Sequence, residues 1–140
     1  MERVSSVHDA GTILDQKLLD GQVHGALTHG LGGAAYEELR YSEAGQPVSA
    51  TFLDYLCPTT AEAGFDLVTG HIVSPSPLTP LGAKGCGEGS SMSFPAAFAN
   101  AVADALAPLG VDVTALPLHG TVLHDLIERK ETETHAADGR

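Results

Sequence analysis

The most informative stretch of this 140-residue chain is Gly82-Ala83-Lys84-Gly85-Cys86-Gly87-Glu88-Gly89-Ser90-Ser91. Four of its first eight residues are glycine, which is used where the backbone adopts a positive φ or approaches another group closely. Such a run exposes backbone N–H groups that bind anions. Two interpretations are open: a loop that holds a phosphate-bearing ligand beside Glu88, or a tight connection between regular elements with a solvated glutamate.

The flanking sequence predicts an α+β fold. Periodicity and turn signals indicate a strand ending near His8, a helix with one buried stripe over residues 21–39, strands over 48–53 and 65–73, and a helix from Pro95 to about Ala107. Three prolines between residues 74 and 80 make a rigid connector into the glycine loop. We expect a mixed sheet with packed helices over residues 1–127 and a disordered polar tail over residues 128–140.

The helix predicted over residues 21–39 is rich in glycine, with Gly25, Gly30, Gly32 and Gly33. Each of these lowers the helix propensity by about 1 kcal/mol relative to alanine. We therefore expect close packing against a neighbour and a buried helix. Residues 30–35 match a dinucleotide-binding fingerprint in letters only, because they lie inside a helical pattern and follow no strand.

Composition restricts the classes of partner. Seven Lys and Arg against 18 Asp and Glu give a net charge of −11, which disfavours nucleic acid. Cys57 and Cys86 form no CxxC pair, so we expect free thiols in a reducing compartment rather than a zinc site or a disulfide. The sequence shows neither an export signal nor an apolar run of about 20 residues. We expect a cytoplasmic protein with no membrane span.

Glu88 is the leading candidate for chemistry. Its glycine neighbours leave room for the carboxylate to enter a site as a general base, the alternative being a loop carboxylate paired with Lys84. Cys86 is either a nucleophile or a small buried thiol. The seven histidines form no HExxH motif, the loop lacks the Gly-Lys-Ser/Thr of a P-loop, and Ser90-Ser91 lacks the serine hydrolase elbow.

Four segments occur in an order and spacing that carry a family resemblance. They are Val7-His8-Asp9-Ala10-Gly11, Gly21-Gln22-Val23-His24-Gly25 with Gly30-Leu31-Gly32, Tyr36-Glu37-Glu38 through Phe52-Leu53-Asp54-Tyr55-Leu56-Cys57-Pro58-Thr59, and Pro75-Ser76-Pro77 through Gly87-Glu88-Gly89 into Pro95-Ala96-Ala97-Phe98-Ala99-Asn100-Ala101. Together they resemble the C-terminal part of the molybdopterin-binding large subunit of the xanthine oxidase and aerobic carbon monoxide dehydrogenase family, the molybdenum hydroxylases.

This resemblance implies a partial molybdopterin-binding domain with Glu88 as the catalytic base for hydroxylation by water-derived oxygen. The implied cofactor is molybdenum–molybdopterin, in its cytosine dinucleotide form, with the metal held through the pterin. The implied cofactor contacts are Ala10, Gly11, Thr12, Ile13, Leu14, Asp15, Gln22, Lys84, Gly85, Cys86 and Gly87. The sequence departs from the family at Asp15, where asparagine is more usual, at His29 in place of glutamine, and at Cys86 in place of valine.

The resemblance also implies partners. They are the remaining large-subunit region, an iron–sulfur subunit, an FAD subunit that receives the electrons, and a small-molecule substrate whose identity the present residues leave open. Because much of the cofactor cradle lies upstream in the family, we expect the chain to be inactive alone, whether excised, encoded separately or truncated. The alternatives are a stand-alone module that binds a phosphate-bearing ligand and a degenerate structural subunit without redox activity.

Overall fold

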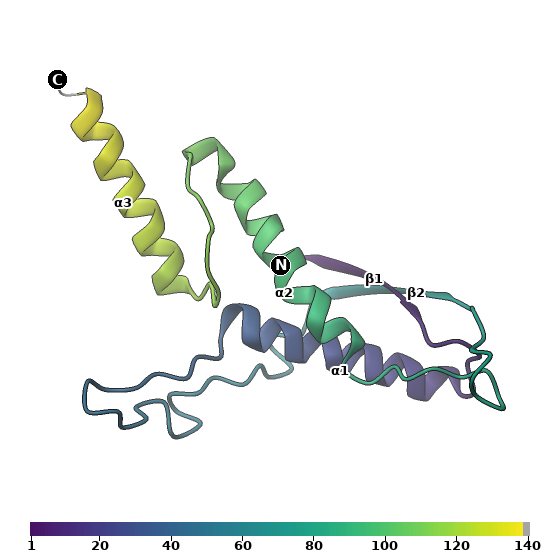
Figure 1. The fold of residues 1–140 in the computed structure, drawn as a ribbon. Coiled ribbons are helices and arrows are strands. Elements are labelled where there is room, and N and C mark those ends of the chain that lie inside the picture. The colour runs from purple at the N-terminus through teal and green to yellow at the C-terminus, as the bar shows by residue number, and fades with distance from the viewer. Residues whose placement is uncertain (139–140) are drawn as a thin grey trace. The chain divides into compact units, whose positions relative to one another are not determined.

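Figure 1 shows the computed structural model, which describes residues 1–138. The elements are β1 (Arg3–Asp9), α1 (Gln16–Ala35), β2 (Asp66–Ile72), α2 (Gly89–Leu106), the 3-10 helix η1 (Ala107–Leu109) and α3 (Gly120–Asp138). The described chain forms two compact units, the first of Met1–Leu31 and Pro58–Phe94, the second of Gly32–Cys57 and residues 95–138. The α+β class is confirmed.

The first unit contains the sheet. β1 and β2 pair in parallel, with Arg3 opposite Asp66 and Asp9 opposite Ile72. Alternate side chains on one face are half-buried, whereas Val7 and Val68 on the other face are exposed. The strands predicted at the N-terminus and over residues 65–73 are confirmed, but the described sheet has two parallel strands instead of the expected mixed arrangement.

Helix α1 begins earlier than the sequence predicts because Asp15 caps it. The Asp15 carboxylate accepts a hydrogen bond from the Leu18 N–H at 2.9 Å, and its carbonyl accepts one from the Leu19 N–H at 3.1 Å. The helix buries one stripe, formed by Leu19, Val23, Ala26, Leu27, Leu31, Ala34 and Ala35. The predicted buried stripe is confirmed, but the other face of the helix is exposed in this chain, which differs from the expected buried helix.

Helix α2 also begins earlier than predicted, at Gly89, which leaves Pro95 inside the helix. The Ser91 side chain and N–H both donate to the Glu88 carbonyl, at 2.6 and 3.0 Å. The Ser93 hydroxyl donates to the Ser90 carbonyl at 3.3 Å. These contacts build a first turn ahead of Pro95, the residue at which the sequence predicts the helix to begin.

The second unit replaces the strand predicted over residues 48–53 with turns. The Val48 N–H donates to the Arg40 carbonyl at 2.9 Å and closes a short antiparallel turn around the Tyr41–Pro47 bridge. The chain then bends, because the Thr51 carbonyl accepts from the Asp54 N–H at 3.0 Å and its hydroxyl accepts from the Leu53 N–H at 3.2 Å. The strand prediction is therefore wrong.

The second unit also holds α3, which continues through Asp138. The sequence predicts a disordered tail from residue 128, whereas the structure has a helix there through Asp138. Local contacts hold the polar part of this helix. The Thr132 hydroxyl donates to the Glu128 carbonyl at 2.9 Å, and Lys130 pairs with Glu133 at 3.7 Å. Residues 139 and 140 of the expected tail lie outside the described residues. Among residues 1–138, no helix combines the length and apolarity that crossing a membrane requires.

Candidate functional site

The glycine loop lies against the turn that follows β1. The Lys84 N–H donates to the Ala10 carbonyl at 2.8 Å, and the Thr12 N–H donates to the Gly82 carbonyl at 3.0 Å. Gly11 has a φ of 64°, and a Cβ added there would overlap the Gly82 carbonyl oxygen. A glycine at residue 11 therefore allows the two segments to approach closely.

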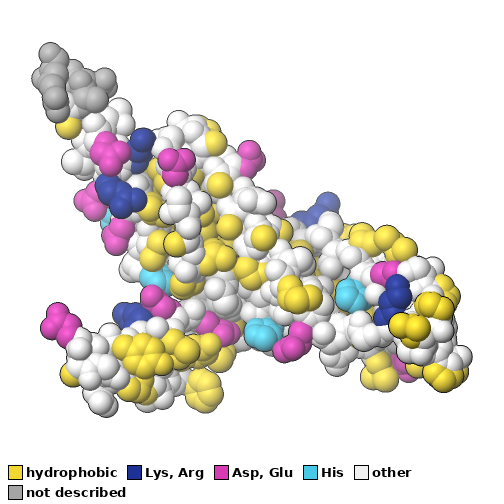
Figure 2. Space-filling model, viewed as in Figure 1, with side chains coloured by type: hydrophobic (Ala, Val, Ile, Leu, Met, Phe, Trp, Pro, Cys, Tyr) yellow, Lys and Arg dark blue, Asp and Glu magenta, His cyan; other side chains and the backbone are white. Residues whose placement is uncertain are grey.

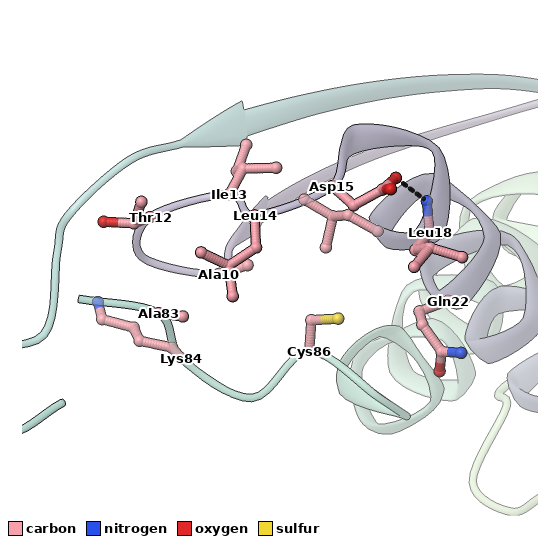
Figure 3. Close-up of a pocket in the computed structure, with 11 residues that line it drawn as sticks. Ala10, Thr12, Ile13, Leu14, Asp15, Leu18, Gln22, Ala83, Lys84 and Cys86 are labelled. Atoms are coloured by element: carbon pink, nitrogen blue, oxygen red, sulfur yellow. Dashed lines mark hydrogen bonds between the residues drawn. The ribbon is translucent and has the colours of Figure 1, made fainter. Parts of the chain in front are cut away.

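A cavity of about 210 Å³ opens between these segments and the start of α1. Figure 3 shows the 10–15 turn and the 83–86 segment on opposite sides, with Gln22 of α1 at one end. The structure brings eight of the residues predicted to contact the cofactor to its walls: Ala10, Thr12, Ile13, Leu14, Asp15, Gln22, Lys84 and Cys86. The predicted residues Gly11, Gly85 and Gly87 do not line it.

Three residues of the cavity wall, Leu18, Leu19 and Ala83, were absent from the sequence prediction. Leu18 and Leu19 follow the Asp15 cap, so recognition of Asp15 as a helix start would have found them. Ala83 pairs with Gly11 across the short bridge between the two segments. No local sequence signal marks that pairing.

Several backbone and side-chain polar groups beside the cavity make no hydrogen bond within the part of the chain that the structure describes. Among residues 1–138, the consecutive N–H groups of Gly85, Cys86 and Gly87 have no hydrogen-bond acceptor, and the Gln22 amide has no partner. A Cβ at Gly87 would lie 3.5 Å from Gln22 Oε1. The loop and α1 therefore present donors and an amide in one small region.

Glu88 stands immediately before α2 in a left-handed conformation. Its φ of 60° is the only positive value for a non-glycine residue in the described chain. Its side chain is 78% exposed, and Oε1 lies 3.8 Å from His29 Nδ1. A helix N-terminus favours a nearby carboxylate. Glu88 does not line the cavity, and the alternative pairing of Glu88 with Lys84 is not formed.

Lys84 is bound to a different carboxylate. Its Nζ lies 2.9 Å from Asp9 Oδ2 and 2.6 Å from Ser74 Oγ, and the Ser74 hydroxyl donates a short hydrogen bond to Asp9 Oδ2. These bonds, from Ser74 first and then Lys84, with one from the Gly11 N–H, hold the pKa of Asp9 far below its usual value of 3.8. The stabilisation is present above about pH 4 and is lost only as acid titrates the lowered pKa.

The His8 side chain packs against the end of the glycine loop. A Cβ added at Gly89 would overlap His8 Cε1, so the imidazole packs directly on the backbone that follows Glu88. His8 Nε2 is buried and has no hydrogen-bond partner among the described residues.

Both cysteines are free thiols, Cys57 exposed and Cys86 half-buried. Among residues 1–138 no group of three or more His, Cys, Asp or Glu side chains is arranged to hold a metal ion.

Comparison with known families identifies the class of domain. The family described as "Molybdopterin cofactor-binding domain" matches residues 1–64. The chain is 41% identical to the nicotine 6-hydroxylase large subunit of Paenarthrobacter nicotinovorans, over 84% of this chain and 14% of that protein. It is 38% identical to the carbon monoxide dehydrogenase large chain of Afipia carboxidovorans, over 82% of this chain and 14% of that protein.

Solved structures agree. The quinoline 2-oxidoreductase of Pseudomonas putida 86 superposes with a TM-score of 0.84 and 38% identity, over 89% of this chain and 16% of that chain. The chain belongs to the molybdenum hydroxylase large-subunit family, and the resemblance inferred from its four segments is confirmed. The chain spans about one seventh of the length of the curated relatives it matches.

Proposed function

We propose that this chain forms one wall of the molybdopterin site of a molybdenum hydroxylase and supplies Glu88 as the general base. The observation that carries the proposal is the cavity beside the glycine loop. Its walls come from the 10–15 turn, the start of α1 and the 83–86 segment. The free N–H groups of residues 85–87 lie next along the loop, and Glu88 follows them.

The residues present fit the molybdenum–molybdopterin cofactor. Three consecutive N–H donors suit phosphate oxygens or the acceptor atoms of a pterin, and the Gln22 amide can both donate and accept. The cavity of about 210 Å³ is smaller than the ~300–1,000 Å³ typical of small-molecule sites. We therefore assign other walls to the remaining large-subunit region, and we propose the cytosine dinucleotide form as the ligand.

When bound, the cofactor supplies the redox chemistry of hydroxylation. The chain's own contribution is binding and proton transfer. The N–H groups of Gly85, Cys86 and Gly87 hold the ligand, and a Glu88 carboxylate oxygen accepts the proton from the water-derived group that attacks the substrate. The left-handed φ of Glu88 supports this role, because strained backbone conformations concentrate at functional sites.

The proposed assembly includes an iron–sulfur subunit, an FAD subunit and a small-molecule substrate, in the cytoplasm. Large hydrophobic side chains support an association with further protein. Phe52, Leu53, Leu78 and Met92 are each more than 80% exposed, and Figure 2 shows hydrophobic side chains open on the visible face. Such exposure is common at interaction surfaces. Several matched relatives are themselves described as large subunits or as a subunit of a complex.

A second candidate is a module that binds a phosphate-bearing ligand without redox chemistry. The exposure of Glu88 and its position outside the cavity favour this alternative. Molybdenum and pterin analysis of complexes from cofactor-producing cells distinguishes the two. Stoichiometric molybdenum supports the hydroxylase, whereas a bound phosphate compound without molybdenum supports the module.

Cys86 provides a direct test of the site. Because its thiol lines the cavity and is half-buried, bound molybdopterin should slow its reaction with maleimide by about 10-fold or more, the protection expected when [L] exceeds Kd by that factor. The measurement compares labelling rates in complexes purified with and without the cofactor. Cys57, which is exposed and lies in the other unit, is the control and should label equally in both. Equal labelling of Cys86 would contradict the proposed site.

A further inference from the structure

Lys84 does not point its ammonium group into the cavity. Figure 3 shows its side chain running away from Cys86 and Gln22, so only its stem lies at the cavity wall. The family resemblance implies a cofactor contact at this residue, but the ammonium is occupied by Asp9 and Ser74. This residue therefore needs a different explanation.

We propose that Lys84 is a positioning residue. Together with Asp9 and Ser74 it forms a clamp that fixes the glycine loop, so that the N–H groups of residues 85–87 face the ligand. The inference rests on the proposed molybdopterin site for its functional consequence. The clamp itself rests on contacts within the first unit.

The clamp joins three segments that are distant in sequence. Asp9 ends β1, Ser74 follows β2, and Lys84 lies in the glycine loop. Lys84 Nζ is 2.9 Å from Asp9 Oδ2 and 2.6 Å from Ser74 Oγ, and the same carboxylate accepts the Ser74 hydroxyl. Asp9 Oδ1 accepts from the Gly11 N–H at 2.8 Å, so one carboxylate also sets the neighbouring turn.

The hydrogen bonds of the loop backbone show why this clamp positions the N–H groups of residues 85–87. The Lys84 N–H is bound to the Ala10 carbonyl, and the Ala83 carbonyl accepts from the Thr79 hydroxyl at 2.9 Å. The next three N–H groups, of residues 85–87, have no acceptor among the described residues. Lys84 is therefore the last residue of the loop that is held from both its backbone and its side chain.

The geometry excludes a Ser–Lys nucleophile. In such a pair the amine takes the proton of the serine hydroxyl, but here Lys84 donates hydrogen bonds to both Ser74 and Asp9, and the Ser74 hydroxyl donates to Asp9. The cluster is a hydrogen-bonded ion pair with a hydroxyl between its charges. Such a cluster holds the three segments together and fixes the loop.

Amide hydrogen exchange in the full chain tests the clamp without the cofactor. The Thr12 and Lys84 N–H groups report on the loop, because they donate to the Gly82 and Ala10 carbonyls. Lys84→Met and Asp9→Asn should each speed exchange of these two groups by about 5-fold, the scale of partly exposed ion pairs, and the double variant should do little more than either single one. Lys84→Arg should restore slow exchange. Lys17→Met, a charge loss at an exposed helix residue, should change nothing there.

Amide exchange in β1 and β2 reports on global unfolding. If Lys84→Met speeds exchange in these strands, the test of the clamp uses Asp9→Asn and Ser74→Ala instead. Unchanged exchange of the Thr12 and Lys84 N–H groups in Asp9→Asn would overturn the clamp. A second measurement, the pterin content of complexes assembled in cofactor-producing cells, separates a positioning residue from a ligand. A clamp predicts that Asp9→Asn loses pterin as Lys84→Met does.

A direct ligand predicts the opposite, because removing the Asp9 charge would release the ammonium to bind the anionic cofactor more tightly. Retention of pterin by Asp9→Asn together with its loss in Lys84→Met would therefore overturn the proposal. If wild-type complexes hold no pterin, the proposed function fails. The exchange measurement then decides the clamp on its own.

Discussion

Replacing Glu88 by Gln in the assembled enzyme is expected to lower the rate of hydroxylation by about 10²–10⁴-fold, the range of a lost general base. The amide cannot accept the proton, but it has the same size and the same backbone conformation. The Glu88 side chain is 78% exposed in this chain and makes only a 3.8 Å contact to His29. The substitution should therefore leave folding and pterin content unchanged, which assigns the loss to chemistry.

The measurement is the initial rate per bound molybdenum, with pterin quantified in the same preparations. Glu43→Gln, which removes a carboxylate from an exposed turn of the second unit, is the matched control and should keep the wild-type rate. Full activity of Glu88→Gln would contradict the assignment of the base. Loss of pterin in Glu88→Gln would instead assign Glu88 to cofactor binding.

The sequence predicted most of the cavity wall through its resemblance to a known family. The family resemblance named the 10–15 turn, Gln22 and the glycine loop, and the structure places eight of these residues around one cavity. Their roles toward the cofactor are still predictions. Periodicity found the buried stripe of α1, since a stripe depends only on spacing along one helix.

The sequence could not predict contacts that depend on distant segments. Lys84 and Glu88 are four residues apart and of opposite charge, which suggested a pair. The structure pairs Lys84 with Asp9, 75 residues away, because the parallel strands bring the end of β1 beside the connector into the loop. Spacing carries no information about such an encounter.

Local signals also failed where a partner was missing. Residues 48–53 have the alternation of a strand, but no neighbouring strand pairs with them in the described chain, and the Thr51 hydroxyl and carbonyl hold a turn instead. Pro95 suggested a helix start, but the hydroxyls of Ser91 and Ser93, four and two residues before it, form an earlier first turn. In both cases hydrogen bonds between side-chain hydroxyls and the backbone favour a local structure that the hydrophobic pattern or the proline does not predict.

Gly30→Ala is the second variant with a large expected effect, a loss of about 1–3 kcal/mol in the free energy of unfolding from overpacking. An added Cβ would lie 2.7 Å from Phe94 Cβ and 3.3 Å from Ser91 Cα. Phe94 is 4% exposed and its ring stacks at a tilt on Phe65. Because the Ser91 contact is to backbone, α2 itself must shift.

Gly25→Ala on the same helix is the control. A Cβ there meets nothing within 4 Å, so the gain in helix propensity should stabilise the full chain by up to about 1 kcal/mol. Chemical unfolding of both variants measures the contrast, and equal stability would contradict the packing of α1 on α2. The shift has a functional consequence as well, because Ser91 binds the Glu88 carbonyl. Gly30→Ala should therefore displace Glu88 and reduce hydroxylation even in complexes that remain folded and keep their pterin.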